Sequence, residues 1–150
     1  MILLIATVVT SCKNTEKQEE VKNPKEMEQE QESDILSTTW MNDIQLNNGA
    51  KWEANIETTE GVLKMQDLLK TQTTASIEDY HQLAKKLSDV KNIVVNECTM
   101  KGASHDNLHI WLYPLIEKIG AMLETENLRD AQNIKQSVKE NIDVYSVYFK

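Results

Sequence analysis

Glycine, proline and aromatic residues are scarce in this chain. Among 150 residues there are four glycines and two prolines, and Phe, Trp and Tyr together make up 5%. Many-stranded sandwiches and barrels need turn residues and aromatic cross-strand pairs in larger supply. The scarcity therefore argues against such folds and favours a mainly helical one.

Positive charge is also in short supply. The chain has 16 Lys and Arg residues against 24 Asp and Glu residues, which gives a formal net charge of -8 at pH 7. Nucleic acid is bound by clustered Lys and Arg that neutralise its phosphates. We therefore expect no nucleic-acid partner, and electrostatic adsorption to anionic lipid is disfavoured for the same reason.

The first eleven residues (MILLIATVVTS) carry no charge and are mostly apolar. They are too short to cross a bilayer core of about 30 Å as a helix. A cleaved export signal fits this length and composition better. The alternative is a buried N-terminal strand followed by an ordinary cysteine.

The run Val9-Thr10-Ser11-Cys12 resembles the lipobox of bacterial lipoproteins. A branched apolar residue stands three positions before the cysteine, and small residues lie between them. The resemblance implies cleavage before Cys12 and lipidation of Cys12. Several acyl chains hold a protein at a membrane because each buried CH₂ contributes about 0.8 kcal/mol. The prediction is an exported lipoprotein, anchored at the periplasmic face or the cell surface.

Beyond Cys12, residues 13–34 form a polar tract with one proline, no aromatic residue and more carboxylates than lysines. Such a composition cannot bury enough apolar surface to offset the entropy lost on ordering. We expect residues 12–34 to be a flexible, acidic tether. A solvated helix with Glu and Lys pairs is the alternative.

Residues 35–57 have a different pattern, with Trp40 and Trp52 on either side of Asn48-Gly49. That dipeptide suits a tight turn whose central residues have positive φ. The prediction is a short hairpin or extended strap. Because tryptophan carries a large apolar area, we expect both side chains to close one end of a helical bundle rather than line a ligand site.

Between residues 58 and 150, apolar residues recur at helical spacing in four segments. The apolar stripes are Val62, Met65, Leu68 and Leu69; Tyr80, Leu83, Leu87, Val90 and Val94; Leu108, Trp111, Leu112, Leu115, Ile119 and Met122; and Ala131, Ile134, Val138, Ile142, Tyr145 and Phe149. The predicted N-caps are Thr58 or Thr59, Ser76 with Asp79, Ser104, and Asn127 with Asp130. Short connections favour antiparallel neighbours, so the prediction is an all-α, four-helix up-down bundle.

Residue types able to bind a soft or borderline metal crowd around the turn between the second and third predicted helices. They are Cys98, Met100, His105 and His109. Thiolate and thioether select Cu(I), and imidazole suits copper or zinc. A copper or zinc site is therefore one hypothesis. The alternatives remain a buried inert thiol, a gap-filling methionine, and histidines that lie at the surface or are hydrogen-bonded to neighbours.

The stretch of residues 98–114 (CTMKGASHDNLHIWLYP) also resembles one found in a group of small lipoproteins. These carry a Cys-Thr-Met-x-Gly-x-Ser-His-Asp run ahead of Leu-His-x-Trp-Leu-x-Pro. The resemblance implies a functional cluster and no named activity. Pro114 falls inside the third predicted helix, where its missing N–H should kink or restart the helix.

Three functions of different classes are compatible with the sequence. The leading hypothesis is a tethered, non-catalytic module that docks a protein partner. The second is metal handling or sensing through the cluster at the turn. The third is a thiol enzyme with Cys98 as nucleophile and His105 or His109 as base. No paired-carboxylate, Ser-His-Asp or dinucleotide-binding signature is present, so we expect that the protein is not an enzyme.

Overall fold

The computed structural model describes residues 35–150. The export signal, the lipidated Cys12 and the tether of residues 12–34 lie outside the described residues, and they stay predictions. Within the described part, a short 3-10 helix, η1 (Thr39–Asn42), precedes four α-helices. These are α2 (Ile56–Thr71), α3 (Ile77–Asn96), α4 (Ala103–Glu124) and α5 (Leu128–Tyr148).

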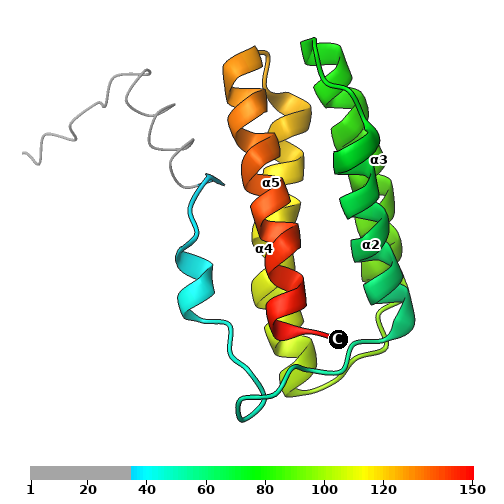
Figure 1. Ribbon diagram of the computed structural model, residues 1–150, viewed down its shortest axis with the longest axis vertical. Coiled ribbons are helices and arrows are strands. Elements are labelled where there is room, and N and C mark those ends of the chain that lie inside the picture. The colour runs from blue at the N-terminus through cyan, green and yellow to red at the C-terminus, as the bar shows by residue number, and fades with distance from the viewer. Residues whose placement is uncertain (1–34) are drawn as a thin grey trace, which may run out of the picture.

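Each helix packs antiparallel against the next one along the chain, and α5 also contacts α2 (Figure 1). The arrangement is an up-down-up-down bundle, which confirms the predicted all-α architecture. None of the helices in residues 35–150 combines the length and apolar character needed to cross a membrane.

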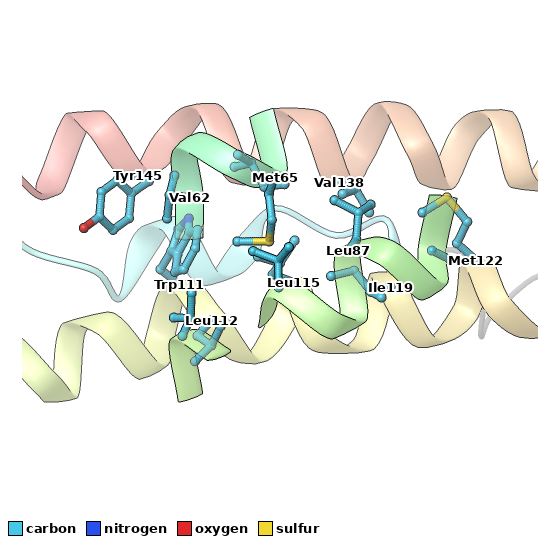
Figure 2. Packing of buried hydrophobic residues seen from close by; sticks show 14 of the residues in the cluster. Val62, Met65, Leu87, Trp111, Leu112, Leu115, Ile119, Met122, Val138 and Tyr145 are labelled. Atoms are coloured by element: carbon cyan, nitrogen blue, oxygen red, sulfur yellow. The ribbon is translucent and has the colours of Figure 1, made fainter. Parts of the chain in front are cut away.

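The core lies between the four helices and is made of the predicted apolar stripes (Figure 2). Side chains from α2, α3, α4 and α5 interdigitate along its length. Its largest fully buried apolar residues are Trp111, Phe149, Met65, Leu83, Leu87, Leu108, Leu115, Ile119, Met122 and Ile142. Burial of this apolar surface is the main source of the stability of the bundle.

Two of the predicted helix starts are confirmed. The Ser76 hydroxyl accepts from the Asp79 backbone N–H, and the Asp79 carboxylate accepts from the Ser76 N–H, so the pair forms a capping box. The Asp79 carboxylate also accepts from the Ala75 backbone N–H. The hydrogen bonds from Ala75 and Ser76, with that from Ala75 the largest cause, lower the pKa of Asp79. Asn127 caps α5 by accepting from two backbone N–H groups.

The other two predicted starts were wrong by a few residues. Helix α2 is preceded by Asn55, and the hydroxyl of Thr58 donates to Asn55 Oδ1 at 2.7 Å instead of capping a helix. Helix α4 is preceded by Gly102, at φ 61, and the Ser104 hydroxyl donates to the backbone oxygen of Lys101. Both helices therefore begin two or more residues earlier than predicted.

The strap before the bundle, residues 35–55, contains the predicted tight turn. Asn48 has φ 50 and Gly49 has φ 87. The flanking residues Asn47 and Ala50 exchange backbone hydrogen bonds of 2.9 and 3.0 Å. Because both central residues have positive φ, the turn has the geometry that favours Asn-Gly in two-residue hairpins.

The two tryptophans of the strap occupy different places. Trp52 pairs with the C-terminal segment through its backbone. Its backbone N–H donates to the backbone oxygen of Tyr148 at 2.8 Å, and its backbone oxygen accepts from the Lys150 N–H at 3.0 Å. It therefore closes one end of the bundle, as predicted. Trp40 belongs to η1, and its ring lies near Lys118 of α4 instead. Helix η1 packs beside α4, on the side of the bundle away from α2 and α3 (Figure 1).

Gly61 lies at the contact between α2 and α3. A Cβ added there would come within 2.3 Å of Val94 Cγ2, and a valine side chain has little freedom to move aside. We expect Gly61→Ala to lower the free energy of unfolding by about 1–3 kcal/mol through overpacking. Urea denaturation measures this loss.

Gly120 provides the matched control, because it is a helical glycine whose added Cβ would meet no atom within 4 Å. Gly120→Ala should stabilise the protein by about 0.5–1 kcal/mol, since alanine is the better helix former. Equal stability changes in the two variants would contradict the close approach at Gly61.

Candidate functional site

The two histidines of the predicted cluster lie together on α4. The ring centroids of His105 and His109 are 4.1 Å apart and their planes are tilted by 55°. Tyr113 stands one turn further, with its ring 5.0 Å from that of His109 and its hydroxyl 3.1 Å from His109 Nδ1. The three rings form a ladder along one flank of α4. Two imidazoles four residues apart on a helix can bind one metal ion from the same face.

Pro114 follows this ladder directly, and α4 continues through it from Ala103 to Glu124. Of the two expected outcomes at Pro114, a restart of the helix is wrong, and a kink stays a prediction. The packing of Trp111, Leu112 and Leu115, all buried on either side of the proline, holds the helix together across the lost hydrogen bond.

Cys98 and Met100 lie in the connection between α3 and α4, and both are half-buried against the core. Nearby in the core, burial raises the pKa of Tyr145, and the hydrogen bond with Thr59 lowers it.

Within residues 35–150 there is no group of three or more His, Cys, Asp or Glu side chains able to hold a metal ion. The fold brings His105 and His109 together, but it does not add Cys98 to them as a third such ligand. Metal binding therefore stays a prediction. His81, the remaining histidine, is 2.9 Å from the backbone oxygen of Thr125 through Nε2 and connects α3 to the end of α4.

A second polar cluster, which the sequence analysis missed, lies inside the bundle between α4 and α5. The Lys118 ammonium is buried and donates to Asn141 Oδ1 at 3.1 Å. Asn141 Nδ2 donates to the Trp111 backbone oxygen at 3.1 Å, and Trp111 Nε1 donates to the Asn141 backbone oxygen at 2.8 Å. The only sequence signal was the spacing of seven residues, which places Lys118 on the face of α4 that carries Trp111.

The surroundings of Lys118 disfavour its charge. Burial lowers the pKa of Lys118, and Glu140 and Glu117 act in the opposite direction. Neither carboxylate reaches it, since the ion pairs among the described residues do not include Lys118. The ring of Trp40 lies over the ammonium, with its centroid 6.0 Å from Nζ, and offers a weak cation–π contact.

This lowered pKa makes stability depend on pH. In the interval between the folded pKa and the ordinary value of 10.5, the unfolded chain binds a proton at Lys118 that the folded chain has lost. The free energy of unfolding should therefore rise with pH across that interval. Urea denaturation from about pH 7.5 to 10.5 gives the free energy of unfolding of the wild type and of Lys118→Met. The difference between the two proteins at each pH measures the effect of Lys118. A difference that stays constant with pH would contradict it.

Comparison with protein-family models, with curated proteins and with solved structures gave no match for this chain.

Proposed function

We propose that this chain is an exported, lipid-anchored lipoprotein whose helical bundle is an interaction module outside the cytoplasm. The observation that carries the proposal is the lipobox-like run ending at Cys12, followed at once by the polar tract of residues 13–34. In this arrangement the anchor, the tether and the strap follow one another along the chain. The tether would then hold the bundle away from the lipid surface.

Exposed apolar side chains on the bundle support docking of a protein partner. Ile56 and Leu63 stand two turns apart on the outward face of α2, and their exposed fractions are 65% and 58%. Neither contributes to the core, and two such side chains on one face can anchor a protein contact. The excess of carboxylates over basic residues favours a partner with complementary positive charge.

Replacement of Cys12 tests the anchor. When the full chain is expressed in a bacterial host that processes lipoproteins, the wild type should fractionate with membranes and Cys12→Ser should become soluble. Mass spectrometry of the N-terminal peptide should show Cys12 as the first residue, carrying acyl groups. Cys98→Ser is the matched control and should stay with the membranes. A soluble wild type with unmodified Cys12 would refute the proposal.

A second candidate function is copper or zinc handling, and the His105–His109 pair is the observation that favours it. With imidazole centroids 4.1 Å apart, the pair can supply two ligands. Met100, on the adjoining connection, is the proposed soft ligand.

The test of metal handling is a titration of the full chain carrying Cys12→Ser with Cu(I) and Zn(II) against a calibrated chelator. His105→Ala and His109→Ala should each weaken binding by about tenfold or more, which corresponds to about 1.4 kcal/mol. His81→Gln should leave metal binding unchanged. His81 belongs to α3 and lies beside the C-terminal end of α4, whereas the histidine pair lies near the N-terminal end of α4. Absence of stoichiometric binding in the unaltered cluster would exclude this function.

A further inference from the structure

The histidine pair on α4 can supply two of the four ligands that a zinc ion usually takes. His105 and His109 are four residues apart, and their ring centroids are separated by 4.1 Å. Two imidazoles on one tetrahedral zinc ion have centroids about 5 Å apart, since each Zn–N bond is about 2.0–2.1 Å long. Rotation of the two side chains by about 1 Å therefore places both rings on one ion.

The hydrogen bond with Tyr113 determines which nitrogen of His109 can bind an ion. The Tyr113 hydroxyl is 3.1 Å from His109 Nδ1, so Nε2 is the nitrogen left for a metal. Metal-binding histidines are commonly oriented in this way, through a hydrogen bond at the second ring nitrogen. Tyr113 is thus a positioning residue for the site.

This flank of α4 is accessible to a second protein. His105 and His109 are half-buried, and Tyr113 is 57% exposed although its ring stands 5.0 Å from that of His109. Tyrosine is enriched in protein interfaces, because its ring supplies contact area while its hydroxyl stays hydrogen-bonded. The pair and Tyr113 therefore lie where another molecule can reach them and complete the coordination of the ion.

One chain by itself does not complete that coordination. Within residues 35–150, no group of three or more His, Cys, Asp or Glu side chains is placed to hold a metal ion. Zinc is bound in proteins by these four residue types, so the thioether of Met100 does not replace a missing ligand. A zinc ion held by one histidine pair would thus keep two positions open.

We propose that two copies of this chain bind one zinc ion between them, each through His105 and His109. Every copy presents the same incomplete pair, so a second copy supplies the two ligands that the first one lacks. A two-fold axis through the ion gives both copies the same contacts and makes a closed site of four imidazoles. The pairing rests on the proposed metal binding by His105 and His109, and it names the partner that this binding recruits.

Analytical ultracentrifugation of the full chain carrying Cys12→Ser tests the pairing. Added Zn(II) should double the mass, the effect should saturate at one zinc ion per two chains, and EDTA should restore the monomer. Cys98→Ser in the same background is the matched control. It should keep the zinc-dependent dimer, because the pairing does not use a disulfide between two Cys98 side chains.

Substitutions of the pair distinguish a shared site from a site within one chain. His105→Ala or His109→Ala removes one imidazole from each copy, which is two of the four ligands. At about tenfold per ligand, zinc-dependent dimerisation should weaken by about a hundredfold, whereas a site within one chain would lose only about tenfold. Tyr113→Phe keeps the ring and should weaken dimerisation by about tenfold through loss of the orienting hydroxyl. His81→Gln, at the other end of α4, should change nothing.

The stoichiometry separates failure of the pairing from failure of metal handling. One zinc ion per chain at monomer mass would overturn the pairing and leave metal handling in place, as would binding of Cu(I) without Zn(II). Absence of binding for both ions would overturn the two together. A dimer of the same strength without zinc, or in both His105→Ala and His109→Ala, would also overturn the pairing.

X-ray absorption at the zinc edge gives a direct answer that does not depend on the folding of any variant. The zinc complex of the full chain carrying Cys12→Ser should show four imidazole nitrogens at about 2.0–2.1 Å from the metal. Two imidazoles completed by water would contradict a site shared between two copies.

Discussion

Trp111→Ala should lower the free energy of unfolding by about 3–5 kcal/mol. Trp111 is fully buried and is the largest such side chain in the described part of the chain. Its ring packs edge-on against Tyr145 at a centroid distance of 5.1 Å, and its indole N–H donates to the Asn141 backbone oxygen. The substitution leaves a large cavity between α4 and α5 and leaves that buried oxygen without its indole donor.

Chemical denaturation followed by circular dichroism measures this loss. Trp52→Ala is the matched control, since Trp52 also donates its indole N–H to a backbone oxygen, that of Gln45 at 2.7 Å, but is only half-buried. It should cost about 1–2 kcal/mol. If the two alanine variants were equally destabilised, the central role of Trp111 in the core would be refuted.

The core was the most predictable feature of this protein, because helical periodicity is a local property of the sequence. Apolar residues at spacings of three and four must lie on one face of a helix, and four such faces have to be buried against each other. Val94 and Val138, for example, were assigned to the core from spacing alone, and both are fully buried. The short connections then made antiparallel packing the expected arrangement.

Helix starts were less predictable where several capping residues compete. Asn55, Thr58 and Thr59 can all cap a helix, and the apolar pattern does not distinguish between them. In the structure Asn55 takes the flanking position, while the Thr59 hydroxyl lies 3.0 Å from the Tyr145 hydroxyl. The choice depends on a partner 86 residues away, which no local pattern contains.

The buried polar cluster could not be found from periodicity, since a lysine beside an apolar stripe is normally assigned to its boundary. Lys118 is buried because η1 covers it with Trp40, and the strap has no periodicity that would place η1 on α4. Similarly, the partial burial of Cys98 against the core depends on the path of the connection between α3 and α4. Both features follow from tertiary packing.

Asn141→Ala is the substitution that tests whether this cluster acts as a unit. The Asn141 side chain accepts from Lys118 and donates to the Trp111 backbone oxygen, and it is 1% exposed. Its removal leaves the ammonium without an acceptor among the described residues. A buried hydrogen bond to a charged group is worth about 1.5–3 kcal/mol, so we expect at least this loss in the free energy of unfolding measured by urea denaturation.

A double-mutant cycle separates the cost of the stranded charge from the cost of the lost side chain. In the Lys118→Met background no ammonium remains to be left unpaired, so Asn141→Ala should cost less there, by about 1–3 kcal/mol. Asn133→Ala, at an exposed position of α5, is the control and should change stability by less than about 0.5 kcal/mol. Additive effects of Lys118→Met and Asn141→Ala would show that the two residues are independent. A coupling of the expected sign would show that Asn141 is retained in the core to solvate a buried charge, because an apolar residue would otherwise fill its place at lower cost.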